Sequence, residues 1–215
     1  MKGRYGVVLA LVVLSFVVQE SVPDTDVTRL LVTWLQAGTL VAAVRAARAP
    51  HRFVRLAALL AALVAVLASV SFIVGGSVRT NAISSATALL VGVAPVVLAL
   101  GLIRDVRATM TVSLQTLCGV LAIYLLIGMF FSFAYAIVSE VGNGPFFAEL
   151  SDPNRSDFLY FSYTTLTTTG YGDLTAVPNV GRTFAVTEAL TGQIYLVTIV
   201  ALIVSNLGRR RRPEA

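Results

Sequence analysis

Six long apolar stretches run along the chain, and short polar segments separate them. They cover residues 5–22, 27–44, 53–75, 82–103, 111–138 and 181–207. A helix rises about 1.5 Å per residue, so about 20 apolar residues are enough to cross a hydrocarbon core about 30 Å thick. The pattern therefore predicts six membrane-spanning helices.

A seventh apolar segment, residues 158–167, is too short to cross a bilayer and is followed by the polar segment 168–173. Non-helical backbone is tolerated at membrane depth only where it is buried in protein or borders a water-filled path. We therefore expect a re-entrant helix over 158–167 and, after it, a loop that borders such a path. The predicted fold class is an all-α membrane protein with this helix and loop between the fifth and sixth spans.

The composition supports a membrane protein and excludes a water-soluble enzyme. Of the 215 residues, 57% are hydrophobic and 13% are charged, whereas soluble domains have about 45–50% apolar and about 25% charged residues. The single cysteine, Cys118, excludes an intrachain disulfide and a cysteine-based metal cluster. No nucleophile triad or metal-ligand cluster is apparent in the sequence, so we expect neither an enzyme nor a cofactor.

The formal charge of +5 is a signal of topology, because the basic residues fall mostly on one side of the predicted spans. With six crossings, twelve of the sixteen share the side of both termini: Lys2, Arg4, Arg45, Arg48, Arg52, Arg55, Arg104, Arg107, Arg209, Arg210, Arg211 and Arg212. Cytoplasmic loops carry an excess of arginine and lysine. Both termini are thus predicted to be cytoplasmic, in a plasma membrane.

The first stretch has a second interpretation. Residues 1–19 resemble a secretory signal peptide, with a basic start and an apolar middle, but the small-x-small cleavage pattern is missing around 18–23. Cleavage would leave five spans and the same cytoplasmic C-terminus.

The chemistry of the chain concentrates in the segment 168–173. Gly170 and Gly172 are two residues apart, so both can take positive φ and let successive carbonyls point the same way. A strip of carbonyl oxygens, extended by the hydroxyl of Thr168, suits a dehydrated monovalent cation better than zinc or calcium. Asp173 places negative charge at the outer mouth of this strip.

This segment resembles the selectivity filter of the potassium-channel pore family, Thr-Val-Gly-Tyr-Gly-Asp, with one difference. The six matching positions are Thr168, Thr169, Gly170, Tyr171, Gly172 and Asp173, and Thr169 stands in place of Val. The resemblance covers about the last hundred residues. It implies that residues 108–215 form a pore domain of outer helix, pore helix, filter and inner helix, in which the carbonyls of Thr168–Gly172 bind K⁺ as the permeant ion. One filter per chain then implies a homotetramer with cyclic symmetry.

Several residues outside the filter are candidates for supporting it. Thr164 lies where many members of the family carry a residue hydrogen-bonded behind the filter, and its hydroxyl predicts weak coupling to Asp173. Glu188 is the only acid within a span, so we expect it to hydrogen-bond the rear of the pore helix or to be protonated. Gly192 matches the gating-hinge glycine of the family, although close helix packing also explains a glycine there.

Two more expectations concern the ends of helices. Asp157, or Ser156 just before it, is predicted to cap the pore helix. The basic clusters Arg45, Arg48, Arg52, Arg55 and Arg209, Arg210, Arg211, Arg212 fit positive-inside anchoring, and such clusters can also bind anionic lipid.

Residues 1–107 hold four spans that do not resemble a voltage sensor. The fourth stretch, 82–103, contains no charged residue and includes Pro95, whereas a sensor needs several charges within the membrane field. The sequence as a whole predicts a potassium-selective channel without steep voltage gating. A weakly selective monovalent cation channel of the same fold remains open, as does a cation transporter subunit, although the latter predicts repeats or four filter-like loops that we do not find.

Overall fold

The computed structural model describes residues 4–74, 80–109, 113–142 and 144–209, and within them the regular structure is helical. The helices are α1 Arg4–Ser21, α2 Asp26–Ala46, α3 His51–Val74, α4 Thr80–Thr109, α5 Leu114–Val141, α6 Arg155–Leu166 and α7 Asn179–Arg209. One isolated β-bridge, between Phe147 and Ala176, pairs the segments on either side of α6. The expected all-α fold is therefore confirmed.

Each of the six predicted spans corresponds to a helix. Four helices, α1, α2, α3 and α5, are long and apolar enough within the described residues to cross a membrane. The segments 82–103 and 181–207 lie inside α4 and α7, which have 30 and 31 residues. The chain is a membrane protein, and α6, with 12 residues, is the short helix expected between the last two long ones.

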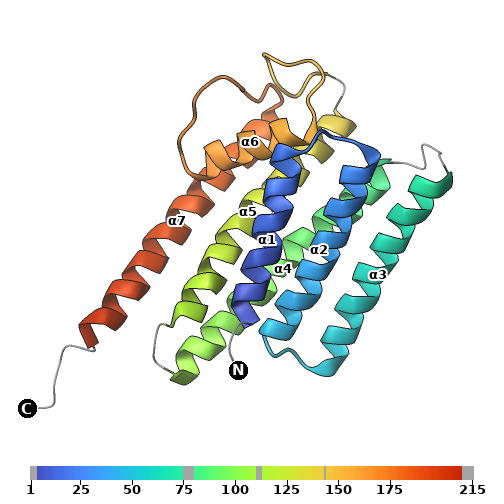
Figure 1. Ribbon diagram of the computed structural model, residues 1–215. Coiled ribbons are helices and arrows are strands. Elements are labelled where there is room, and N and C mark those ends of the chain that lie inside the picture. The colour runs from blue at the N-terminus through green and yellow to red at the C-terminus, as the bar shows by residue number, and fades with distance from the viewer. Residues whose placement is uncertain (1–3, 75–79, 110–112, 143, 210–215) are drawn as a thin grey trace, which may run out of the picture.

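The long helices run side by side, and α6 lies at one end of the bundle (Figure 1). Helix α5 packs against α1 and α4 on one side and against α6 and α7 on the other, so it joins the two halves of the chain. Among the described helices, α7 packs on α5 and α6, and it diverges from the rest of the bundle toward its C-terminal end (Figure 1). Helix α3 lies at the opposite edge, against α2 and α4.

Helix α1 begins, and helix α7 ends, at the end of the bundle opposite to α6 (Figure 1). The Arg4 guanidinium donates hydrogen bonds to the Ala46 carbonyl (2.9 Å) and to Asp105 (3.2 Å), and the Tyr5 hydroxyl also donates to Asp105 (3.1 Å). These contacts gather the start of α1, the end of α2 and the end of α4. The basic loop between α2 and α3 lies at this same end.

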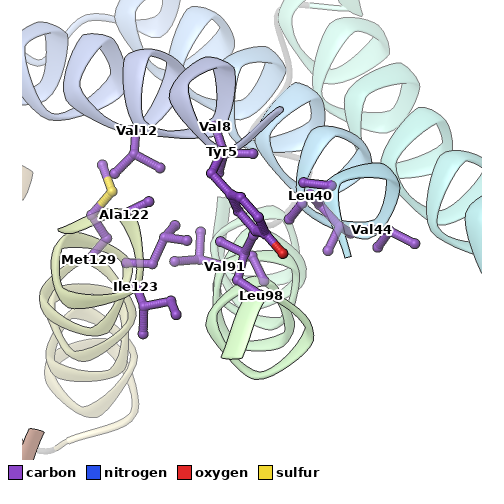
Figure 2. Packing of buried hydrophobic residues seen from close by; sticks show 14 of the residues in the cluster. Tyr5, Val8, Val12, Leu40, Val44, Val91, Leu98, Ala122, Ile123 and Met129 are labelled. Carbon is purple, nitrogen blue, oxygen red and sulfur yellow. The ribbon is translucent and has the colours of Figure 1, made fainter. Parts of the chain in front are cut away.

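The interior of the bundle is apolar, and so is much of its outer surface. Val12 of α1, Leu98 of α4 and Met129 of α5 are almost fully buried in the core shown in Figure 2. On α3, Leu59 and Leu63 are more than half exposed. Helices that are apolar inside and outside fit a lipid environment, in which outward-facing apolar side chains carry no penalty.

Candidate functional site

Helix α6 begins with a reciprocal cap. The Asn154 side chain accepts hydrogen bonds from the backbone N–H groups of Ser156 (2.8 Å) and Asp157 (3.2 Å), and the Asp157 carboxylate accepts one from the Asn154 N–H (2.7 Å). This is a capping box, which satisfies N–H groups that have no partner within the helix. The capping role expected of Ser156 was wrong. Asp157 is the acidic partner in the box, and Asn154, two residues earlier than Ser156, is the cap.

A cluster of aromatic side chains packs on one face of α6. Phe158 and Phe161 are buried against Tyr135 of α5 and against Phe146 and Phe147, which precede α6 in the chain. Most of these ring pairs are edge-on or tilted, with centroids 4.8–6.2 Å apart, which is the favourable range for aromatic contacts. The segment before α6 is thereby held as a rigid support for it.

The chain leaves α6 through a compact turn anchored on Thr164. The Thr164 carbonyl accepts hydrogen bonds from the N–H groups of Thr169 (2.8 Å) and Gly170 (3.1 Å). Its hydroxyl donates to the Phe161 carbonyl (3.0 Å), within α6. Thr164 therefore contacts the next segment through its backbone, and its side chain stays within the helix.

Residues 168–172 have an alternating backbone. The φ angles of Thr168, Gly170 and Gly172 are +56°, +53° and +80°, and Thr169 and Tyr171 between them are not in the left-handed region. Such alternation turns successive peptide planes so that their carbonyls can align. The positive φ expected at both glycines is confirmed. At Thr168 it comes at a steric cost, because the residue has a Cβ, and glycine spacing did not predict it.

Neighbouring side chains restrain Thr168. Its hydroxyl lies 2.7 Å from the Thr167 carbonyl and 2.9 Å from Nε2 of Gln193, which donates to it from α7. These hydrogen bonds help to hold a residue in a conformation that threonine seldom adopts. Gln193 was not among the candidates from sequence, and its place directly after Gly192 is the only signal that could have suggested it.

Asp173 is held by Tyr160. The Tyr160 hydroxyl donates to the Asp173 carboxylate at 2.7 Å, and the Tyr160 ring stacks on Tyr171 with centroids 6.2 Å apart and planes 6° from parallel. The partner of Asp173 is thus a phenol one turn before Thr164 on α6. Sequence reasoning missed Tyr160 because no spacing rule links a helix position to the end of an irregular loop.

Glu188 is fully buried and joins three helices. One carboxyl oxygen accepts a hydrogen bond from the Tyr135 hydroxyl of α5 (2.6 Å), and the other lies 2.5 Å from the Ser162 hydroxyl of α6. The Ser162 hydroxyl is also 2.7 Å from the Gly128 carbonyl of α5. The expected contact with the rear of α6 is present, through Ser162.

Gly192 allows α7 to pass close to the end of α6. A Cβ at this position would overlap the Leu166 carbonyl oxygen, a backbone atom that also accepts a hydrogen bond from the Tyr124 hydroxyl (3.4 Å). Helix α7 continues on both sides of Gly192. The packing interpretation of this glycine therefore has a structural reason, and bending at Gly192 stays a prediction.

A single chain leaves the candidate site open on one side. The residues from Thr167 to Asp173 are exposed, and Tyr171 exposes 71% of its surface. Exposed large apolar side chains also line α7 at Val186, Leu190, Ile194 and Val197. Among the residues that the structure describes, no group of three or more His, Cys, Asp or Glu side chains could hold a metal ion.

Comparison with known proteins concerns this same half of the chain. A family model described as "Ion channel" matches residues 119–209. Protein LctB of Bacillus caldotenax is 33% identical over 111 residues, which cover 49% of this chain and 82% of the relative. Protein LctB of Geobacillus stearothermophilus is 36% identical over 112 residues, which cover 49% of this chain and 83% of the relative. No solved structure matches the chain significantly.

Proposed function

Because this chain belongs to the ion-channel family that its residues 119–209 match, we propose that it conducts potassium ions passively across the membrane. The observation that carries the proposal is the alternating backbone of residues 168–172. Its carbonyl oxygens, from Thr168 to Gly172, replace the hydration shell of K⁺ in the proposed filter. Asp173 attracts cations to the outer mouth, and Tyr160 fixes its carboxylate there.

In this proposal, four copies of residues 108–215 surround one pore, and residues 1–107 of each form a four-helix unit outside it. The exposure of Tyr171 and of the apolar face of α7 supports a homotetramer, since copies around an axis would bury both. Thr164 supports the filter through its carbonyl. Opening involves bending of the inner helix α7 at Gly192.

We place the channel in the plasma membrane with both termini in the cytoplasm and six crossings per chain. The support is the location of the basic loop between α2 and α3 at the end opposite to α6, together with the positive-inside rule. The acidic residues near the candidate filter then lie outside the cell.

We also propose that this cytoplasmic end binds anionic phospholipid. A groove of about 560 Å³ between α2, α3 and α4 is lined by apolar residues such as Val64 and Val97, with Arg104 among its lining residues. Exposed arginines follow beside it, at Arg45, Arg48, Arg52 and Arg55. Arg210, Arg211 and Arg212 lie outside the described residues. An acyl chain fits the groove, and the arginines complement a phosphate.

The lipid proposal is tested by native mass spectrometry of the purified channel with phosphatidylglycerol or phosphatidylcholine. We expect preferential retention of the anionic lipid and about fivefold weaker retention in Arg104→Gln, as for one surface arginine. Arg55→Gln, on the same side but not in the groove lining, should have less effect. Equal retention of both lipids by the wild-type protein would contradict the proposal.

Ion selectivity is tested in planar bilayers with potassium on one side and sodium on the other. The reversal potential should lie near the potassium equilibrium potential. A value near zero would favour the weakly selective cation channel, and saturable transport without unitary currents would favour a transporter subunit.

The filter assignment is tested by Gly170→Ala. The residue has positive φ, so alanine is strained there, and loss of current with an intact oligomer is expected. Gly38→Ala, in α2 with open space around the added Cβ, is the matched control and should conduct normally. Normal conduction in Gly170→Ala would overturn the assignment.

A further inference from the structure

The buried cluster around Glu188 contains more hydrogen-bond contacts than its hydroxyls can supply with protons. Three short oxygen–oxygen contacts are present: Tyr135 to Glu188 (2.6 Å), Ser162 to Glu188 (2.5 Å) and Ser162 to the Gly128 carbonyl (2.7 Å). All three distances are those of O–H···O hydrogen bonds, each of which needs one proton. The hydroxyls of Tyr135 and Ser162 carry two protons between them.

The proton for the third contact comes from the carboxyl group of Glu188. The Gly128 carbonyl can only accept, so Ser162 donates its proton to that carbonyl in the 2.7 Å contact. The Ser162 oxygen then faces Glu188 with a lone pair. If Glu188 were a carboxylate, two oxygens without a proton between them would lie 2.5 Å apart. A proton on the carboxyl group removes this conflict, because the acid then donates to Ser162 and accepts from Tyr135.

Within the part of the chain that the structure describes, no positively charged side chain interacts with Glu188 to compensate an ionised carboxyl. None of the ion pairs among the described residues includes it. The other titratable side chains near it, Tyr124 of α5 and Tyr163 of α6, direct their hydroxyls to the carbonyls of Leu166 and Leu125. A buried carboxylate without a partner charge is costly, and the usual outcome is the neutral form.

We propose that Glu188 is a neutral carboxylic acid in the folded channel and that its proton completes a chain of hydrogen bonds from Tyr135 through Glu188 and Ser162 to Gly128. The chain joins the inner helix α7 to α5 and α6 one turn before Gly192. Glu188 is thus a positioning residue, and it places no fixed negative charge behind the filter. This deepens the proposed function, since it describes how the pore helices are held together, and it can be tested without ion conduction.

The direct test is infrared spectroscopy of the full-length channel in lipid at neutral pH. The wild-type protein should show the carbonyl stretch of a protonated carboxylic acid, and Glu188→Gln should lose it. Glu149→Gln is the matched control, because Glu149 is exposed and accepts hydrogen bonds from the Thr175 hydroxyl and N–H, which lower the pKa of its carboxyl. It should leave the band unchanged. If the difference between wild type and Glu188→Gln contained no such band, the proposal would be overturned.

A second spectrum tests the direction of the hydrogen bond. In Ser162→Ala the acid loses the acceptor for its proton, so the carbonyl band should shift to higher frequency. An unshifted band would show that the proton of Glu188 is not directed at Ser162.

Variants at position 188 test the consequence for the pore. Glutamine can donate from its amide to Ser162 and accept from Tyr135, so Glu188→Gln should keep the oligomer and the unitary conductance of the wild type. Glu188→Leu loses both contacts of residue 188, with Tyr135 and with Ser162, and should lose oligomer stability. A reduced conductance in an intact Glu188→Gln oligomer would indicate that a negative charge had been removed, and failure of Glu188→Gln to assemble would equally overturn the proposal. These outcomes are distinct from a wrong filter assignment, which leaves the infrared band in place.

Discussion

Both halves of the chain contain hydroxyl groups that donate within their own helix, and the second half adds hydroxyls that donate to backbone carbonyls of a neighbouring helix. In α2 and α3, Thr33, Thr39 and Ser69 donate to the carbonyl four residues earlier in their own helix. In the unit of α5, α6 and α7, Ser162, Tyr163 and Tyr195 donate to carbonyls of a neighbouring helix. A hydrogen bond within a helix does not fix the position of that helix, whereas one between helices sets both register and distance.

This difference indicates where accurate positioning is needed. Helices α1 to α4 pack mainly through apolar side chains, helped by few polar links such as Gln36 to Ser15 (3.3 Å). In the proposed function, the second unit positions a loop whose carbonyl oxygens coordinate the ion, and tyrosines such as Tyr163 and Tyr195 join its helices. Variants that weaken inter-helix contacts should therefore harm the second unit more than equivalent variants harm the first.

The largest effect is expected at Gly192. Gly192→Ala adds a Cβ that overlaps the Leu166 backbone, so α7 must move away from α6. Overpacking of this kind costs about 1–3 kcal/mol. Thermal dissociation of the oligomer should occur at a clearly lower temperature, and current should fall. Gly38→Ala in α2 should leave both unchanged, and equal losses in the two variants would remove the contrast between the halves.

A smaller effect is expected when single hydroxyls are removed. Tyr163→Phe loses a 2.6 Å hydrogen bond to the Leu125 carbonyl of α5, which should cost about 1 kcal/mol of unfolding free energy. Thr39→Val in α2 loses only a bond to its own helix, and its cost should be smaller. Denaturant unfolding in detergent micelles measures both. A larger loss in Thr39→Val would contradict our account of the two halves.

At the proposed outer mouth, Tyr160→Phe should leave the fold intact and change the proposed filter alone. The ring keeps its stacking on Tyr171, and Asp173 loses its 2.7 Å partner. One hydrogen bond of about 1 kcal/mol corresponds to about a fivefold change in an equilibrium. Single-channel recordings should show closed intervals that are more frequent by about that factor, with unchanged unitary selectivity. Unaltered dwell times would mean that this bond does not stabilise the conducting filter.

The smallest effect is expected from membrane voltage. The stretch 82–103 carries no charge, and each elementary charge moved through the field contributes only about 2.3 kcal/mol per 100 mV. Open probability should vary little across the physiological range in bilayer recordings. Steep activation would show that the first half contains a moving charge that the sequence does not reveal.

The sequence predicted features that depend on local chain properties. Hydrophobic length placed the long helices, and the glycine spacing predicted positive φ at Gly170 and Gly172. The start of α6 was misplaced by three residues, because Asn154, Ser156 and Asp157 are all residues that cap helices and only the geometry selects among them. The left-handed conformation of Thr168 was missed, since nothing local favours it.

Contacts between segments that are distant in the chain could not be predicted from the sequence. The pairing of Tyr160 with Asp173 depends on the path of the loop, and the pairing of Tyr135 with Glu188 depends on the relative register of α5 and α7. Gly192 shows the same limit in another form. A glycine in a helix is compatible with bending and with close packing. The position of the Leu166 carbonyl, which a Cβ at residue 192 would overlap, is the observation that supports close packing.

The hydrogen bond from Gln193 to Thr168 joins the inner helix directly to the first residue of the proposed filter. Movement of α7 and the orientation of the Thr168 hydroxyl are therefore linked equilibria, and linkage is reciprocal. In the proposed filter, an ion that binds at Thr168 and orders its hydroxyl stabilises the position of α7 in which Gln193 donates to that hydroxyl. If the channel works as proposed, the ion bound at Thr168 acts as a ligand for α7, and the concentration of the permeant ion acts as an effector of the position of this helix.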